Sequence, residues 1–529
     1  MLISITCKSL HNRVFDIIVL VECHLAERFG NTLKTAWSRY LTALLRITPA
    51  LILILIWENG LTACNGGVTA TTPVEHVVTV TPTTTKASQG PHIPTVVKTP
   101  TRTTAPLQTP DADIGKLRGL TIRFWYVYPD VERIERGEDT LKTLVGVFNR
   151  TNTWGIQVVA IPFDRYEDLF QKLESLSSGD LPNLIVGYSD QVAALDGRTH
   201  LIVDLAPYLS DPRWGFTTQE VQDFYPLFWD QNMVADKRVG LPFYRYAQVL
   251  FYNLTWAKEL GFNVPPTSVE EFSNQACAAM AANRYDKDPL NDGTGGWVIN
   301  SEALTLASWI YSFKGEIVDI SGKGYQINSN ETRDAFTFLR GLYDAGCAWQ
   351  DVNRYPNSAF VDRKALFITS STSGISAQEA AFKDANSKDE WTVIPFPPPY
   401  GKPALVTYGP SLAAIKASSD KQLAAWLLAK WFMAPEQQSR WVERYGTWPV
   451  RVSAEGLLDQ YKKAHPQWAA SLKLLSYARN EPAIPSWSLN RWVLQDAGTQ
   501  LFAINFSKAD IPALLEMLNQ TMNELDGQF

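Results

Sequence analysis

The stretch Leu120-Thr-Ile-Arg-Phe-Trp-Tyr126 is rich in apolar residues and has the length of a β-strand, and it opens an alternating series. An amphipathic helix is predicted at 140–148, a strand at 156–161, a helix at 166–176 and a strand at 184–188. Strands that alternate with helices specify a parallel sheet that is covered by helices. The sequence therefore predicts an α/β fold, in which ligands bind where the strands end.

A second set of elements begins at Gly240-Leu-Pro-Phe-Tyr-Arg-Tyr246. A strand is predicted at 248–252, and Asn253 is a suitable N-cap for a helix at 254–260. Pro265-Pro-Thr-Ser268 is a start signal for a second helix that extends to residue 283. Further helices are expected at 301–313 and 330–345, strands at 364–369, 391–394 and 412–415, and only helices after residue 420.

Several motifs follow one another in this part of the chain: Gly240-Leu-Pro-Phe243, Tyr252-Asn253, Pro265-Pro-Thr-Ser-Val-Glu-Glu-Phe272, Phe360-Val-Asp-Arg-Lys-Ala-Leu-Phe367, Ala424-Ala-Trp426, Pro435-Glu-Gln-Gln438 and Trp448-Pro-Val-Arg451. Their order resembles that of the family 1 extracellular solute-binding proteins of ABC transporters. The resemblance covers residues 120–453 and lies in the order of loose motifs. One position departs from it, because Arg363 stands where the family has glycine, which leaves the turn there open.

This resemblance implies a two-lobed periplasmic-binding-protein-like fold of type II, in which each lobe is a mixed sheet flanked by helices and the C-terminal part is helical. Lobe 1 would comprise residues 113–240 and part of 360–420, and lobe 2 residues 254–355 and the C-terminal helices. The implied function is the capture of a small polar solute, a carbohydrate being favoured, for the permease subunits of an ABC importer. The implied protein is a monomer without enzymatic activity, cofactor or metal.

The N-terminal part carries export signals. The apolar run Leu51-Ile-Leu-Ile-Leu-Ile-Trp57 follows a basic segment, as in a secretory signal. Next comes Leu61-Thr-Ala-Cys64, which resembles the lipobox of bacterial lipoproteins, whose cysteine is lipidated and becomes the N-terminus. We therefore expect residues 1–63 to be an N-terminal extension and signal peptide, and a lipid on Cys64 to anchor an extracytoplasmic protein to the cell membrane. Cleavage at another residue and an uncleaved anchor are the alternatives.

Residues 64–112 are predicted to be a disordered tether, because they are rich in threonine and proline and contain no aromatic residue. The body, residues 113–529, is long enough for more than one compact unit. The net charge of −6, without a block of lysine and arginine, argues against a surface for nucleic acid. No second stretch of the sequence approaches the ~20 apolar residues of a membrane span.

Cleavage before Cys64 leaves two further cysteines, Cys277 and Cys347, in an oxidising compartment. They make one possible disulfide, and two free thiols are the alternative. The sequence lacks the Cys-x-x-Cys pattern that redox chemistry inside the cell would use.

Catalytic and metal-binding patterns are sparse. The body contains His200 and His465 but no Gly-x-Ser-x-Gly motif, so a nucleophilic hydrolase site is not expected. The stretch Asp286-Lys-Asp-Pro-Leu-Asn-Asp-Gly293 lacks the ligand spacing of a calcium loop, and we expect a polar turn. A cell-surface hydrolase that acts on carbohydrate through two carboxylates stays an alternative function, as does a sensor or adhesion lipoprotein.

Aromatic residues at predicted strand ends are the main candidates for contacts with the solute. Flat rings fit the apolar faces of sugars, and Asp190 or Arg245 can bind hydroxyl groups. The alternatives are core packing for each ring, an ion pair for Arg245 and helix capping for Arg451, which matches the arginine of the family's P-V-R loop. The candidate ligand-binding residues are Tyr126, Tyr188, Asp190, Tyr244, Arg245, Trp297, Phe313, Tyr408, Trp448 and Arg451.

Overall fold

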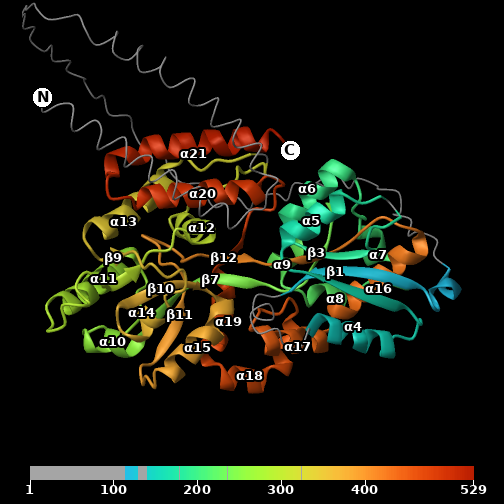
Figure 1. The fold of residues 1–529 in the computed structure, drawn as a ribbon, viewed down its shortest axis with the longest axis horizontal. Coiled ribbons are helices and arrows are strands. Elements are labelled where there is room, and N and C mark those ends of the chain that lie inside the picture. The colour runs from blue at the N-terminus through green and yellow to red at the C-terminus, as the bar shows by residue number, and fades with distance from the viewer. Residues whose placement is uncertain (1–112, 129–139, 178, 235, 323) are drawn as a thin grey trace, which may run out of the picture. The chain divides into compact units, whose positions relative to one another are not determined.

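The computed structural model describes residues 113–128, 140–177, 179–234, 236–322 and 324–529. The predicted signal peptide, Cys64 and the tether lie outside these residues. Within the described residues, two mixed β-sheets with helices on their faces form the α/β architecture that the resemblance implied. We call the first sheet with its helices lobe 1 and the second sheet with its helices lobe 2 (Figure 1).

Lobe 1 is built on the alternating series that the sequence predicted. Its central strand β1 (Thr121–Val127) pairs in parallel with β2 (Gln157–Phe163) and β3 (Leu184–Gly187). Two strands from later in the chain extend the sheet to the order β2-β1-β3-β13-β6. They are β13 (Ser411–Ala414), which is antiparallel to both of its neighbours, and β6 (Leu241–Pro242).

Helices bury both faces of the first sheet. Successive side chains of a strand point to opposite faces. Phe124 therefore lies in one hydrophobic core and Trp125 in another. Figure 1 shows α4 and α16 on the first of these faces and α5 and α6 on the second. The four helices are α4 (Thr140–Thr151), α5 (Tyr166–Glu174), α6 (Ser189–Thr199) and α16 (Ser419–Phe432).

Lobe 2 is organised around β7 (Tyr246–Asn253), a strand that is buried over almost its whole length. It pairs antiparallel with β10 (Ala365–Ser371), β11 (Trp391–Ile394) and β12 (Leu405–Tyr408). The path through this sheet is β14-β12-β7-β10-β8-β9, with β11 beside β7. The outer strands are β8 (Gly295–Val298), β9 (Ala348–Trp349) and β14 (Ala478–Asn480).

The strand β14 corrects one prediction, because the sequence indicated only helices after residue 420. This segment of three residues pairs in parallel with β12. Its extended conformation is therefore set by a partner strand far away in the sequence. The predicted lobe boundaries stay a prediction, although β13 joins the first sheet and β10, β11 and β12 join the second.

Two helices of lobe 2 begin at the predicted caps. The Asn253 side-chain oxygen accepts a hydrogen bond of 2.9 Å from a backbone N–H in the first turn of α10 (Leu254–Glu259). The Ser268 hydroxyl does the same for α11 (Val269–Arg284), at 3.2 Å. The helices predicted at 301–313 and 330–345 are α12 (Ala303–Ser312) and α13 (Asn330–Asp344).

Two C-terminal helices complete lobe 2, where α20 packs against α12 and α21 against α13 (Figure 1). None of the described helices combines the length and apolar character that a bilayer crossing needs. The remaining helices and strands are α7 (Ala206–Ser210), α8 (Thr218–Gln222), α9 (Pro226–Asp230), β4 (Met233–Val234), β5 (Lys237–Arg238), α14 (Asn357–Val361), α15 (Ile375–Asp384), α17 (Pro435–Tyr445), α18 (Asp459–Ala464), α19 (Pro466–Leu472), α20 (Trp487–Leu501) and α21 (Ile511–Asp526).

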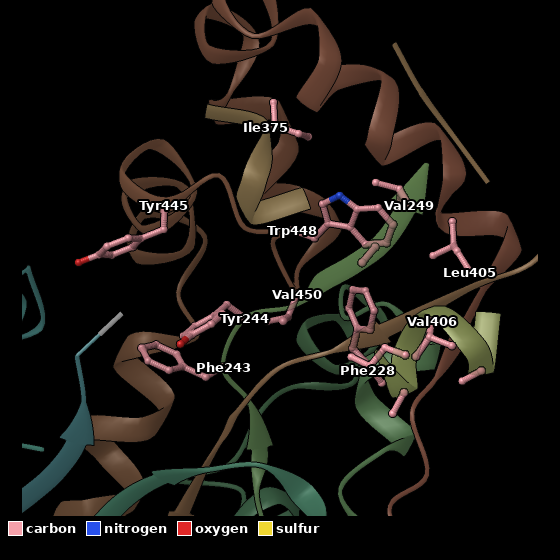
Figure 2. Close-up of a cluster of buried hydrophobic side chains, with 14 of the residues drawn as sticks. Phe228, Phe243, Tyr244, Val249, Ile375, Leu405, Val406, Tyr445, Trp448 and Val450 are labelled. Carbon is pink, nitrogen blue, oxygen red and sulfur yellow. The ribbon is translucent and has the colours of Figure 1, made fainter. Parts of the chain in front are cut away.

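The chain passes between the lobes from β6 to β7, from β12 to β13, and along residues 446–451 between α17 and α19. Arg245 and Trp448 exchange backbone hydrogen bonds of 3.3 and 2.7 Å, so the first and third of these segments are paired. Figure 2 shows the rings of Phe228, Tyr244 and Trp448 in the buried cluster around this pairing. The lobes are therefore joined by paired backbone, and the buried residues around it belong to the same hydrophobic cluster as residues of both lobes.

The turn that the sequence left open at Arg363 has the conformation that glycine favours. Its φ is 56°, in the left-handed region. The guanidinium forms ion pairs with Asp389 (2.7 Å) and Glu259 (2.6 Å). These contacts help to hold a backbone conformation that is costly for a residue with a Cβ atom.

Cys277 and Cys347 form a disulfide that joins α11 to the residue before β9. Their Cα atoms are 4.5 Å apart, and the bond closes a loop across a sequence separation of 70. In the chain-entropy model such a bond stabilises the fold because it restricts the unfolded chain.

Replacing both Cys277 and Cys347 by serine should lower the free energy of unfolding of the body by up to about 4 kcal/mol. Urea unfolding of wild type and variant, with and without reductant, measures this difference. The wild type should lose stability on reduction, whereas the variant should not respond. Two alkylatable thiols in freshly exported wild-type protein would contradict the pairing.

Candidate functional site

Five of the predicted solute contacts are buried in the hydrophobic core: Tyr126, Tyr244, Trp297, Phe313 and Trp448. The indole N–H of Trp297 donates to a hydroxyl of β10 at 3.1 Å. The indole N–H of Trp448 donates to a serine hydroxyl of α19 at 2.9 Å. These rings present no open face to a solute in this structure, so the site built below does not include them.

The two predicted arginines hold backbone segments together. Arg245 has no exposed surface and donates to the carbonyl oxygen of Pro410 at 2.7 Å, and burial lowers its pKa to about 10. Arg451 pairs with Asp223 at 2.5 Å and lies over the ring of Phe224. Because both side chains are used within the protein, we leave them out of the site as well.

Tyr188, Asp190 and Tyr408 lie where strands of the two lobes end. Tyr188 and Asp190 follow β3 and begin α6, and Tyr408 is the last residue of β12. Two further charged residues interact with them electrostatically: Glu481, directly after β14, and Arg491, on α20. Helix α20 of lobe 2 also contacts α6 of lobe 1 (Figure 1). We call these five residues the charged cluster.

The carboxylate of Asp190 is buried at the N-terminus of α6, where backbone N–H groups donate to it. Burial raises its pKa to about 7, the charge of Glu481 adds to this rise, and Arg491 opposes it. Burial also raises the pKa of Glu481, which accepts a hydrogen bond from the indole of Trp487 at 3.2 Å. Asp190 is therefore partly protonated near neutral pH.

The guanidinium of Arg491 is half-buried. Burial opposes its charge, but Glu481, Tyr188 and Asp190 hold its pKa above the usual value. In the part of the chain that the structure describes, no carboxylate oxygen lies within the 4.0 Å of an ion pair with Arg491. Opposite charges that are buried but form no direct ion pair need polar groups between them, because an unpaired buried charge is costly.

Polar and aromatic groups surround Tyr408. Its hydroxyl donates to the Ser371 hydroxyl at 2.7 Å, and its ring centroid lies 5.8 Å from that of Tyr246. Burial, together with the carboxylates of Glu302 and Glu481, raises its pKa. The site thus combines hydrogen-bonding charges with tyrosine rings.

Sequence reasoning missed several of these residues. Glu481 and Arg491 follow residue 453, where the resemblance ends, and no motif marks them. Tyr246 had a usable signal, because alternation along an extended segment places it on the same face as Tyr244. Nothing in the sequence around Glu302 distinguishes it from other acidic residues at the start of a helix.

A cavity of about 970 Å³ lies between the two lobes. On one side it is lined by Met233 and Val234 of the β4–β5 hairpin. An ion pair between Lys237 and Asp196, at 2.6 Å, holds this hairpin to α6. The segment 482–485, which follows the charged cluster, lines the other side.

The structure offers no metal site among the residues it describes, since three or more suitable ligands gather nowhere in them. The loop at 286–293 is an exposed turn in which Asp286 accepts a hydrogen bond from Asn291 at 2.9 Å.

Comparison with known families gives one match that spans most of the body. The sequence model described as bacterial extracellular solute-binding protein matches residues 144–470. Among curated proteins, a probable ABC transporter-binding protein of Deinococcus radiodurans is 31% identical over 144 residues. That match covers 26% of this chain and 33% of the relative, so the chain spans about a third of that relative's length.

Solved structures with a similar fold include two sugar-binding proteins. One is a cyclic alpha-maltosyl-1,6-maltose binding protein from Arthrobacter globiformis, with a TM-score of 0.64 and 16% identity over 78% of this chain and 100% of that one. The other is the sugar-binding protein MalE from Xanthomonas citri, with a TM-score of 0.63 and 19% identity over 77% of this chain and 98% of that one. At these identities the similarity shows the fold.

Replacing Asp190 by asparagine should flatten the pH dependence of unfolding of the ligand-free protein. An acid whose pKa rises on folding from 3.8 to about 7 stabilises the fold less as the pH rises, because the unfolded chain releases its proton first. Relative to the variant, the wild type should lose up to about 1.4 kcal/mol per pH unit between about pH 4 and pH 7. Chemical unfolding across this range measures both slopes, and equal slopes would contradict the assignment.

Proposed function

Because the chain belongs to the bacterial extracellular solute-binding protein family, we propose that it captures a small polar solute, a carbohydrate in the first place, and delivers it to an ABC importer. The solute lies in the charged cluster, where groups from lobe 1 and lobe 2 face one another. Approach of the lobes around the solute produces the form that the importer recognises. The family consists of binding proteins, and no catalytic step is part of this proposal.

The proposal rests on one observation: the cluster holds charges of opposite sign that are buried or half-buried and form no direct ion pair with one another. Asp190 and Glu481 accept hydrogen bonds, whereas Arg491 donates them. A hydroxyl group does both, so a polyol satisfies all three side chains at once. Hydrogen bonds to charged groups contribute roughly 1.5–3 kcal/mol each. A few of them therefore approach the roughly −8 kcal/mol of micromolar binding.

The tyrosine rings supply the second part of a carbohydrate site. Tyr246 and Tyr408 lie next to the charged groups, with ring centroids 5.8 Å apart. Aromatic rings pack well against the apolar C–H faces of a sugar, while its hydroxyl edges reach the charges. The names of the similar proteins support the same solute class and the same partner: two solved structures bind sugars, and the Deinococcus relative is described as an ABC transporter-binding protein.

Replacing Arg491 by methionine should weaken binding of the solute roughly tenfold to a hundredfold, because its hydrogen bonds to the solute are lost. The melting temperature of the ligand-free protein should fall modestly, since the buried carboxylates of Asp190 and Glu481 lose the positive charge that offsets them. A thermal-shift screen with sugars, amino acids and polyamines identifies the solute, and titration calorimetry gives the affinities. Arg440→Met, at an exposed position on α17, is the matched control.

Two outcomes would contradict this reading of the site. Equal affinity in the Arg491 variant and the wild type would place the solute elsewhere. Conversion of a bound sugar into a product by the wild type would show that the protein is a hydrolase and that capture is not its function.

We also propose that a lipid on Cys64 holds the protein at the outer side of the cell membrane. The support is the sequence alone: an apolar run followed by Leu61-Thr-Ala-Cys64. Two or more acyl chains give stable anchoring where one is marginal. The tether of residues 64–112 would then let the body reach a permease from its anchor.

Replacing Cys64 by alanine should move the protein from the detergent phase to the aqueous phase on detergent partitioning, because the thiol is the only acceptor for the diacylglyceryl group. Cys7→Ala, upstream of the proposed cleavage point, is the control and should partition like the wild type. A mature wild-type N-terminus mapped away from Cys64 would reject the anchor.

A further inference from the structure

The cavity between the β4–β5 hairpin and residues 482–485 is not used by the function proposed above. Its volume of about 970 Å³ is at the upper end of the ~300–1,000 Å³ of pockets that hold drug-sized ligands. Its walls are mostly aliphatic. Met233 and Val234 line one side, the sequence Pro-Ala-Ile-Pro of residues 482–485 lines the other, and the fully exposed Ile320 also contributes.

Two segments that line the cavity lead directly along the chain to the charged cluster or to a residue that contacts its neighbour Ser189. Strand β4 starts directly after Asn232, whose amide oxygen lies 3.3 Å from the hydroxyl of Ser189, the residue between Tyr188 and Asp190. The opposite wall begins directly after Glu481, whose charge also acts on Tyr311 in the lining. The cavity therefore begins within one residue of Glu481 on one segment and of Asn232 on the other.

Two charged residues of the cavity wall, Arg479 and Glu316, already satisfy each other. Arg479 makes hydrogen bonds of 2.9 and 2.7 Å with Glu316 and lies 4.0 Å from the ring centre of Tyr311. Among the described residues that line the cavity, Tyr311 is the one aromatic residue, and its ring is buried. A second sugar ring here would find no open aromatic face. Its hydroxyls would exchange water for few new partners, chiefly Asp319 and Gln326.

We infer that the captured solute is amphiphilic: its polar head occupies the charged cluster, and an aliphatic or aryl group attached to that head occupies the adjoining cavity. This inference rests on the proposed function, because the same cluster holds the head. Burial of apolar surface of the solute against aliphatic walls is favourable without any partner for hydrogen bonds. The cluster thus selects the polar head of the solute, and the cavity selects the apolar group that is attached to that head.

Methyl and hexyl glycosides of glucose, galactose and mannose test the inference, since each pair shares a head and differs in its apolar group. A fully buried methylene raises affinity roughly fourfold. The hexyl glycoside of a sugar that binds should therefore bind at least about tenfold more tightly than its methyl glycoside, even if the chain is only partly buried. Titration calorimetry on the mature protein measures the ratio of the two affinities. Maltose and maltotriose are the comparison ligands, because they are extended by sugar units in place of an alkyl chain.

Charges placed in the wall should remove this advantage. Met233→Asp and Ile484→Asp should each lower the affinity for the hexyl glycoside to that for the methyl glycoside. The affinity for the methyl glycoside should stay within about twofold of the wild-type value. Met233→Ser is the milder variant if either charged variant fails to fold. Ile504→Asp, at a position that is 91% exposed and outside the cavity, is the matched control and should keep the full ratio.

The outcomes separate the inference from the function on which it rests. Equal affinity for a methyl and a hexyl glycoside overturns the amphiphilic solute and leaves sugar capture standing. A larger gain from maltotriose than from the hexyl group overturns it in favour of an extended sugar. Failure of every sugar and glycoside to bind overturns the amphiphilic glycoside and the carbohydrate part of the proposed function, and failure of amino acids and polyamines as well overturns solute capture.

Discussion

The hydrogen bonds of the buried Arg245 guanidinium fix the geometry on which both lobes depend. It donates to the Pro410 carbonyl oxygen (2.7 Å) and the Ser411 hydroxyl (3.2 Å), on the segment that returns from lobe 2 to lobe 1. A buried charge is tolerated when its donors are used, so these bonds fix the spacing between two crossing segments. Gly409 makes the spacing possible: its φ is 152°, and a Cβ atom there would lie 2.4 Å from the Tyr244 carbonyl oxygen.

The same spacing positions the aromatic part of the proposed solute site. Tyr246 and Tyr408 stand opposite each other in the pairing of β7 with β12. The ring centroids of Tyr244 and Tyr246 are 5.5 Å apart, which continues the row into the core. These rings are therefore held by sheet hydrogen bonds and by core packing. Binding a solute against them does not require ordering of long side chains, which removes a usual cost of association.

The fold could be predicted wherever a local pattern determines the structure. The caps at Asn253 and Ser268 were found because an N-cap side chain acts within one helical turn. The strands of lobe 1 were found because their apolar runs alternate with amphipathic helices. Strand β14 (Ala478–Asn480) was missed, because Arg479 and Asn480 give it no apolar run and its conformation depends on β12. When a strand forms only because it pairs with a distant segment, its own sequence carries no local pattern that predicts it.

The same distinction applies to the site. Tyr188 and Asp190 could be identified as strand-end residues of a parallel sheet. Trp297 was identified by the same rule, but its ring is buried against rings of α11 and α12, and a sequence does not show which strand ends stay open. Glu481 and Arg491 gain their role only by facing Asp190 from the other lobe, so no local pattern predicts them. In the function proposed above, this dependence on both lobes couples capture to closure, because a polar solute would satisfy the separated charges only while the lobes face one another. Binding and the closed arrangement therefore stabilise each other to the same extent.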